Sequence, residues 1–313
     1  YTHNGSVFGL LGDNPSQEML DLYSNQKHVT ADTPPAFILA ATDDFLVPVK
    51  NSLLYYEALV ENKVSATMHI YPTGGHGFGW GDNYIYKTYY TTLANGKSAR
   101  NYSICYDTKN YVARWVAYPM HSYYTSGDFN SETFVADPNF STSEQIGRTY
   151  ANSAYNRGHQ LAKAQRKVTA LAREQSNYYT NMTPQNATLN SGEWLKLEEK
   201  ERGAWMCSDT LYMVSGCHFD NYNTKVANND GKSCPVPTHY FKVMLRTKSG
   251  NSGKKVSDCS AGELQCAAYL VENSAEATPQ LMSVEALEQR VGFTFFVNVP
   301  NAPKSTYSAS DWR

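Results

Sequence analysis

The chain has 313 residues, of which 41% are hydrophobic and 18% charged, and its formal net charge is −2. This length gives room for two domains with separate cores. No segment approaches the roughly 20 apolar residues that a membrane-spanning helix needs, so the sequence predicts no membrane partner. The small net charge excludes a strongly basic tail as the main contact with nucleic acid, but not a local basic surface.

The charge is unevenly distributed along the chain. Residues 1–92 contain 4 Lys and Arg against 9 Asp and Glu, a balance of −5, whereas the remainder contains 23 against 20, a balance of +3. The length allows two domains or one large one, and the charge balance differs between the two parts of the chain.

All six cysteines lie after residue 92. An even number of cysteines in a Tyr- and Asn-rich chain predicts disulfides, an oxidising compartment and hence a secreted or periplasmic protein. The alternative is six buried free thiols in a cytosolic protein. No C-x-x-C pair occurs, which disfavours a metal–thiolate cluster. Because the chain starts at Tyr1 and shows no signal peptide, we expect a processed or truncated product.

The first segment predicts a short α/β unit. Residues 34–41 (PPAFILAA) form an apolar run of strand length, 51–61 (NSLLYYEALVE) have helical spacing, and 65–71 (SATMHIY) predict a second strand. A strand, a helix and a strand joined by short links favour parallel pairing. A glycine-rich loop around His76 follows the second strand.

Asp44 follows the first of these strands and His76 follows the second. Together with T-P-P at 33–35, V-P-V at 47–49 and G-G-H-G-F-G at 74–79, they make residues 8–81 resemble the C-terminal part of α/β-hydrolase esterases of the acetyl and carbohydrate type. That resemblance implies Asp44 as the triad acid and His76 as the triad base.

The serine of such a triad is absent. In that fold the serine precedes the acid in a G-x-S-x-G turn, and no G-x-S-x-G occurs in this chain. The first segment is therefore expected to be a partial hydrolase: the tail of a larger enzyme, a fusion remnant, or half of a domain that another polypeptide completes. An acetyl or carbohydrate esterase whose serine-bearing part is missing is the alternative function.

The second segment has short predicted strands separated by long loops rich in Asn, Ser and Thr. Strands are predicted at 111–118, 211–215 and 239–246, helices near 161–175 and 192–203, and an exposed loop at 249–260. We expect the boundary within 83–100, which gives domains at 1–92 and 93–313.

Four ordered motifs lie between residues 155 and 198: Y-N-R-G-H-Q at 155–160, T-N-M-T-P-Q at 180–185, L-N-S-G-E-W at 189–194 and L-E at 197–198. The set resembles the DNA/RNA non-specific endonuclease family over about residues 100–313. This resemblance implies an α+β domain of the ββα-metal type with a central antiparallel sheet flanked by helices.

The resemblance also implies site residues. His159 would be the general base, Asn190 the metal ligand, and Arg157 and Glu198 further catalytic residues, with Asn181, Gln185 and Arg157 contacting nucleic acid. These residue types suit phosphodiester hydrolysis, since neutral imidazole takes a proton from water near neutral pH. One amide oxygen plus waters can hold Mg²⁺ or Mn²⁺.

Two departures from the family pattern stand out. Asn156 replaces the usual acidic residue before R-G-H, and the stretch 127–137 lacks the arginine that some relatives carry. Four basic residues after the motif could either contact phosphates or form a solvated helix face: Lys163, Arg166, Lys167 and Arg173.

The sequence therefore predicts a metal-dependent endonuclease acting on DNA and RNA. A nucleic-acid-binding protein whose catalytic site Asn156 impairs is a second alternative, beside the esterase. The oligomeric state is left open.

Overall fold

A computed structural model describes residues 11, 14–44, 47–72, 84–93, 95–147, 150 and 154–312. The chain divides into two compact units, Tyr1–Tyr84 and Ile85–Arg313. Among the described residues, no helix has the length and apolar character needed to cross a membrane.

The first unit is built on two parallel strands. Strand β1 (Ala36–Ala41) pairs with β2 (Ala66–Tyr71) in register from one end to the other, and helix α3 (Lys50–Glu61) connects them. A short helix α2 (Gln17–Leu22) and a 3-10 turn η1 (Asn25–Lys27) precede them. The predicted strand–helix–strand order and parallel pairing are confirmed.

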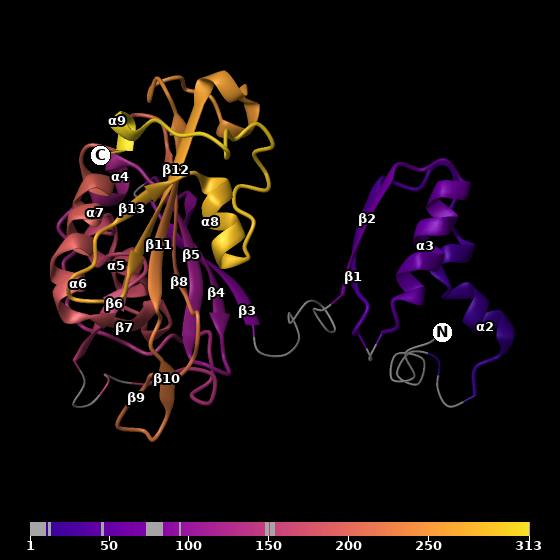
Figure 1. The fold of residues 1–313 in the computed structure, drawn as a ribbon, viewed down its shortest axis with the longest axis horizontal. Helices are drawn as coiled ribbons and strands as arrows, with labels where there is room; N and C mark the ends of the chain where they lie inside the picture. The colour runs from indigo at the N-terminus through magenta and orange to yellow at the C-terminus, as the bar shows by residue number, and fades with distance from the viewer. Residues whose placement is uncertain are drawn as a thin grey trace. The chain divides into compact units, whose positions relative to one another are not determined.

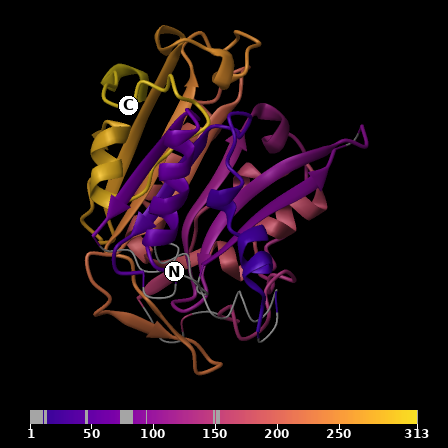
Figure 2. The ribbon, with the colours of Figure 1, turned by 90° about the vertical axis from the view of Figure 1, so that its right-hand side faces the viewer.

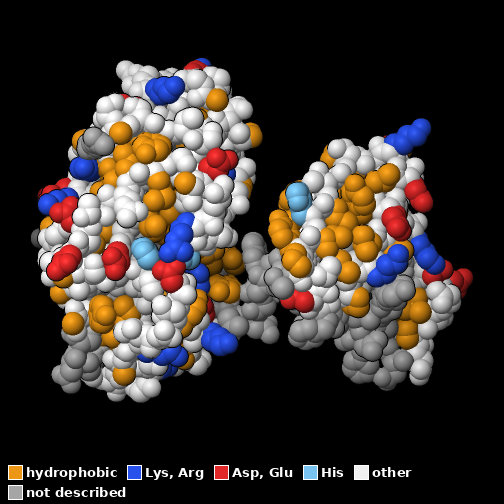
Figure 3. Space-filling model, in the orientation of Figure 1, with side chains coloured by type: hydrophobic (Ala, Val, Ile, Leu, Met, Phe, Trp, Pro, Cys, Tyr) orange, Lys and Arg blue, Asp and Glu red, His pale blue; other side chains and the backbone are white. Residues whose placement is uncertain are grey.

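One face of this small sheet is apolar and solvent-accessible. Phe37 is 65% exposed, Leu39 48% and Tyr71 45%, and Figure 3 shows hydrophobic side chains gathered on the visible face of this unit. Asp44 lies just after β1, where its Oδ1 accepts a hydrogen bond from the Val47 backbone N–H at 2.9 Å. His76, the other predicted triad residue, lies outside the described residues.

The second unit contains a seven-stranded sheet (Figure 1). The five pairings recorded between β4 and β13 are antiparallel, and Figure 2 shows the long strands running side by side. In spatial order the strands are β13 (Gln280–Met282), β12 (Leu264–Glu272), β11 (His239–Thr247), β8 (Leu211–His218), β5 (Val112–Met120), β4 (Ser98–Asp107) and β3 (Tyr84–Thr92).

Each face of the sheet has its own core. Helix α8 (Val284–Val291) packs Val284 and Leu287 on one face. Helices α6 (Ala187–Ser191) and α7 (Glu193–Arg202) pack on the other face through residues that include Trp194 and Leu197. Figure 1 shows these two layers on opposite sides of the strands. The expected antiparallel sheet with flanking helices is confirmed.

The remaining elements are short. They comprise α4 (Ser122–Thr125), β6 (Tyr155–His159), η3 (Lys163–Gln165), α5 (Ala170–Ser176), η4 (Tyr179–Asn181), β7 (Met182–Asn186), β9 (Lys225–Ala227), β10 (Ser233–Pro235), η5 (Val256–Asp258), η6 (Ala261–Glu263) and α9 (Ala309–Trp312).

The structure differs from the sequence-based predictions in two places. Strand β3, which falls within the predicted first domain 1–92, is the edge strand of the large sheet, although the division between the units, after Tyr84, lies within the expected boundary range 83–100. The helix expected near 161–175 is a 3-10 turn followed by α5, which begins where Thr169 caps it by accepting from the Ala172 N–H.

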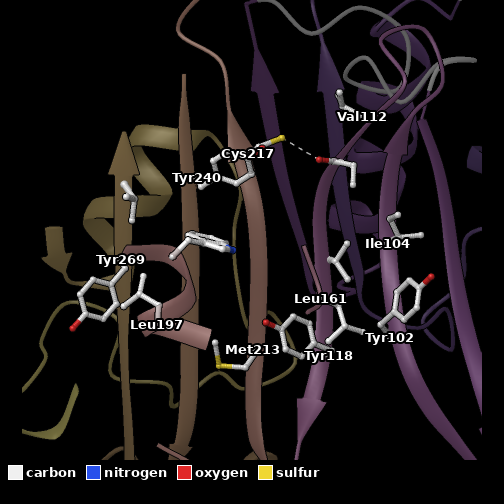
Figure 4. Packing of buried hydrophobic residues seen from close by; sticks show 14 of the residues in the cluster. Tyr102, Ile104, Val112, Tyr118, Leu161, Leu197, Met213, Cys217, Tyr240 and Tyr269 are labelled. Carbon is white, nitrogen blue, oxygen red and sulfur yellow. Dashed lines mark hydrogen bonds between the residues drawn. The ribbon is translucent and has the colours of Figure 1, made fainter. Parts of the chain in front are cut away.

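The cysteines form no disulfide. All six are free, and all except Cys207 are buried. The Cys217 thiol, for example, donates to the Ala113 carbonyl at 3.1 Å within the core (Figure 4). The predicted disulfides are therefore wrong in this structure, because the thiols are separate core side chains. They give no support to an oxidising compartment.

Candidate active site

The predicted catalytic motifs meet in one strand–strand–helix unit. Strand β6 pairs antiparallel with β7, so that His159 lies opposite Met182 and Asn156 opposite Gln185. Helix α6 follows β7 directly, capped by the Asn186 side chain, which accepts from the Thr188 and Leu189 backbone N–H groups. Helix α6 packs against both strands and against α7. The unit therefore carries His159, Gln185 and Asn190 on adjoining elements.

Gly158 allows the two strands to approach closely at the motif. A Cβ atom at this position would lie 2.5 Å from the Cβ of Gln185 and 2.6 Å from its Oε1. Real Cβ atoms do not approach this closely, so only glycine fits between Arg157 and His159 with Gln185 in place. Steric contact with Gln185 therefore explains why the middle residue of R-G-H is glycine.

The core anchors the end of β6. Leu161, two residues after His159, is fully buried and belongs to the core on the α7 side of the sheet. Figure 4 shows its side chain among Tyr102, Ile104 and Tyr118 from the neighbouring strands. This packing fixes the backbone that carries the imidazole.

The His159 side chain is held by an asparagine. His159 is half-buried, and its Nε2 lies 3.2 Å from the Oδ1 of Asn177. The Nδ2 of Asn177 donates to the Ser131 carbonyl at 3.0 Å, which fixes the orientation of the amide. Because Oδ1 can only accept, Nε2 must carry the proton. The neutral ring then has its lone pair on Nδ1.

Burial keeps this imidazole uncharged. It lowers the pKa of His159 from 6.5 to about 4, against the hydrogen bond with Asn177, which raises it. The positive charges of Arg173 and Arg157 lower it further. At neutral pH the ring can therefore accept a proton.

Arg157 shares an aromatic neighbour with His159. Its guanidinium lies 3.8 Å from the centre of the Phe134 ring, and the Phe134 and His159 rings are 5.6 Å apart. A cation stacked on an aromatic face is held in place without losing its charge. Arg157 is half-buried, whereas Asn156, the residue before it on β6, is exposed.

Asn181 is a structural residue here. It is fully buried. Its Oδ1 accepts from the Leu161 N–H at 3.0 Å, and its Nδ2 donates to the Leu161 and Ser176 carbonyls at 2.9 and 2.7 Å. The Asn181 amide therefore connects, through these hydrogen bonds, the chain just after His159 with the end of α5. In this position it has no exposed surface for the nucleic-acid contact that the sequence predicts.

Gln185 is also fully buried, and within the described part of the chain neither its Oε1 nor its Nε2 has a hydrogen-bond partner. Buried amides are normally satisfied, so this one indicates a polar species beside it, such as water. Direct contact with nucleic acid does not suit its burial, whereas contact through water does.

Asn190 suits a hard cation. It is half-buried on α6, and its amide makes no hydrogen bond to the described residues. No group of three or more His, Cys, Asp or Glu that could hold a metal occurs within the described ranges. An amide oxygen such as that of Asn190 is a donor type that such an ion accepts. Mg²⁺ accepts such a donor because it keeps several waters.

Glu198 lies on α7 beside a buried ion pair. Lys242 and Glu201 are 2.5 Å apart and 1% and 0% exposed, and the Glu198 carboxylate is 3.9 Å from Arg202. Burial raises the pKa of Glu198 to about 7, although the charge of Lys242 lowers it. Near neutral pH this carboxyl can accept or donate a proton.

Two of the four basic residues after the motif are buried. Arg166 is 0% exposed, and its guanidinium donates to the carbonyls of Asn101 and Pro119, both at 2.9 Å. Arg173 is 3% exposed. Neither lies on a solvated helix face, whereas Lys163 and Lys167 are partly exposed.

Sequence reasoning missed Asn177 and Phe134. Both contact His159, yet both come from positions without a motif, in a chain rich in asparagine and aromatic residues. The signal that could have pointed to Asn177 is its place four residues before Asn181, on the segment that faces β6.

A histidine at the end of one strand of an antiparallel pair, with an asparagine on the helix that follows the second strand, is the arrangement expected of a ββα nuclease. Residues 81–302 match the family described as DNA/RNA non-specific endonuclease, and the chain belongs to this family. It is a hydrolase with nuclease activity, and the family depends on divalent metal ions.

Several relatives share the second unit. Mitochondrial Endonuclease G of Bos taurus is 26% identical over 226 residues, which cover 66% of this chain and 71% of that protein. Mitochondrial Nuclease EXOG of Homo sapiens is 28% identical over 213 residues, 63% of this chain and 55% of that protein. The crystal structure of the EndoG/EndoGI complex has a similar fold, with a TM-score of 0.52 at 24% identity, over 67% of this chain and 89% of that one.

The first unit has separate relatives. Residues 9–94 match the prolyl oligopeptidase family. Endo-1,4-beta-xylanase B of Butyrivibrio fibrisolvens is 46% identical over 77 residues, which cover 25% of this chain and 12% of that protein. These matches support a hydrolase fragment at the start of the chain.

The expected location needs correction. The nucleases that match the second unit, from Bos taurus, Homo sapiens and Saccharomyces cerevisiae, are mitochondrial proteins. This contradicts a secreted or periplasmic protein, and the free cysteines remove the physical reason for expecting one.

Proposed function

We propose that this chain is a Mg²⁺- or Mn²⁺-dependent endonuclease that hydrolyses phosphodiester bonds in both DNA and RNA. The observation that carries the proposal is the bond between His159 Nε2 and Asn177 Oδ1. It leaves Nδ1 as the free proton acceptor of a neutral ring, which is what general-base catalysis needs.

In this mechanism His159 takes a proton from the attacking water at Nδ1. The imidazolium that forms keeps its hydrogen bond to Asn177, which raises the pKa of the ring and so favours the charged form. Arg157, stacked on Phe134, offers a guanidinium fork to a phosphate oxygen.

Asn190 would hold the divalent ion through its amide oxygen, with Gln185 reaching the same hydration shell through water. Bound there, the ion would polarise the phosphoryl group and stabilise the leaving 3′ oxygen. Glu198, whose pKa lies near 7, would orient water and exchange protons at this shell.

Contacts of this kind explain the expected lack of sequence and sugar preference. Arginine, the ion and the base all act on the phosphate and the attacking water, and phosphate contacts carry no base information.

Degradation of plasmid DNA and of RNA, with Mg²⁺ and with EDTA, tests the proposal. We expect cleavage of both substrates with Mg²⁺ only, and a loss of about 10²–10⁴-fold in His159→Ala at unchanged thermal stability. Wild-type rates in His159→Ala would refute the role of the imidazole. Binding without metal-dependent cleavage would favour a nucleic-acid-binding protein with an impaired site.

A further inference from the structure

Two cations converge on one acidic side chain next to the candidate active site. The Glu132 carboxylate contacts Lys163 Nζ through Oε2, and Arg173 NH2 through Oε1 at 2.9 Å. The three residues come from separate segments: the loop before β6, the turn η3 and helix α5. Two positive charges thus share one negative charge, which leaves the group with a net charge of about +1.

This group is joined to His159 through a single carbonyl. The Ser131 carbonyl oxygen accepts from Arg173 Nε at 2.9 Å and from Asn177 Nδ2 at 3.0 Å. Asn177 in turn holds His159. On the other side of Glu132 along the chain, Phe134 contacts both His159 and Arg157. The loop residues 131–134 therefore connect the cation pair to the base.

The three side chains differ strongly in exposure. The Arg173 side chain is 4% exposed, that of Lys163 33% and that of Glu132 65%. A buried guanidinium needs an anion, because an unpaired buried charge is costly. The present anion is the end of a mostly exposed side chain. A competing anion can replace it only by supplying the same negative charge, so that the buried guanidinium stays paired.

The replacement that fits best is a phosphate. The Nε and NH1 groups of Arg173 already donate to the Ser131 and Lys163 carbonyls. Its NH2 group, which now contacts Glu132, is therefore what it offers to a phosphate oxygen, and Lys163 adds a point charge. A backbone phosphate beside the scissile one could occupy this place while His159 Nδ1 faces the attacking water.

We propose that Lys163 and Arg173 form a second phosphate-binding site beside the active site, and that Glu132 occupies this site as an internal anion in the free protein. The proposal rests on the nuclease function, since it names a substrate contact of the same site. Its ligand is the nucleic-acid backbone, bound one phosphate away from the cleavage position.

The proposed phosphate site is tested by measuring DNA binding. The affinity for a labelled duplex of about 20 base pairs is measured by fluorescence anisotropy, in EDTA and between about 50 and 200 mM salt. Glu132→Gln should tighten binding by about three- to tenfold, because the competing charge is removed. Lys163→Met should weaken binding and reduce the slope of log K against log salt by about 0.9, the effect of one lost phosphate contact. In the Lys163→Met background, Glu132→Gln should change binding by less than about twofold.

The matched control is the exposed pair Lys254–Glu263, which is 52% and 42% exposed and lies in a loop away from β6. Glu263→Gln makes the same charge change and should shift binding by less than about twofold. Equal effects of Glu132→Gln and Glu263→Gln would overturn the proposal, as would an unchanged salt slope in Lys163→Met.

This test is independent of cleavage. If the Glu132 effects appear in a protein that does not cleave with Mg²⁺, the proposed function fails and the phosphate site stands. If cleavage requires His159 but Glu132→Gln behaves like Glu263→Gln, the nuclease stands and the phosphate site is wrong.

Discussion

His159 illustrates how a side chain acquires its chemistry from neighbours outside its motif. Asn177 sets which nitrogen is protonated, Phe134 covers the ring, and burial lowers its pKa to about 4. The motif R-G-H alone shows none of these effects.

A pH profile follows directly from this pKa. Because protonation removes the base, kcat/KM of a Glu198→Gln variant, which lacks the carboxyl that titrates near pH 7, should fall on the acidic side with a midpoint near pH 4 and stay level from about pH 5.5 to neutrality. Circular dichroism at each pH would show that the protein stays folded. An acidic limb centred near 6.5, the value of an unperturbed histidine, would contradict the environment described here.

Gly158→Ala should destabilise the protein. The new Cβ would lie 2.5 Å from the Cβ of Gln185, so β6 and β7 must separate. Overpacking of this kind costs about 1–3 kcal/mol, measured by chemical denaturation. Gly262→Ala is the control: a Cβ there meets only the Ser260 Oγ, at 4.0 Å, and should change stability by less than about 0.5 kcal/mol. Equal stability of both variants would show that the strands can relax.

At the scale of the elements, α7 is attached to the sheet through charge as well as through apolar packing. Lys242 on β11 reaches Glu201 on α7, lies 4.2 Å from the centre of the Trp194 ring, and is 1% exposed. Tyr118 donates to the second carboxylate oxygen of Glu201 at 2.9 Å. This buried network supports the helix that carries Glu198.

Lys242→Met should therefore lower the free energy of unfolding by about 3–5 kcal/mol, because it leaves the Glu201 carboxylate buried without its counter-ion. Adding Glu201→Gln should recover part of the loss, since the unpaired charge disappears. Urea unfolding of the two single variants and the double variant measures this coupling. Additive losses would mean that the two charges do not interact.

Elements with a clear pattern could be predicted from the sequence, and others could not. The first unit follows from its apolar runs, and α7 from its helical spacing. Strand β12 (LQCAAYLVE) is buried along nearly its whole length, so it has no alternation that would mark it as a strand. Strand β4 begins with S-A-R-N at 98–101, which has no apolar alternation that would mark it as a strand.

The candidate site shows the same limit. The four motifs located His159, Gln185 and Asn190 because they lie at fixed spacings near strand and helix ends. The partners Asn177, Phe134 and Glu132 depend on where loops return in space, which spacing does not encode. Asn181 matches the motif, yet it is buried and so has a structural role.

At the scale of the whole molecule, the described parts of the two units differ in the size of their sheets. The second has a seven-stranded sheet with a core on each face, whereas the described part of the first has two parallel strands with exposed apolar residues on one face. The match to the nuclease family spans residues 81–302, nearly all of them in the second unit. The activity of the chain is therefore expected to reside in the second unit.

The most direct measurement is the position of Mn²⁺ by anomalous diffraction from crystals of the full chain soaked in the ion. We predict one dominant peak at the Asn190 amide oxygen, at about 2.0–2.2 Å and completed by waters, on the side of the β6–β7 pair that the His159 Nδ1 faces. A dominant peak elsewhere, or an Asn190 amide without any ion, would contradict this prediction.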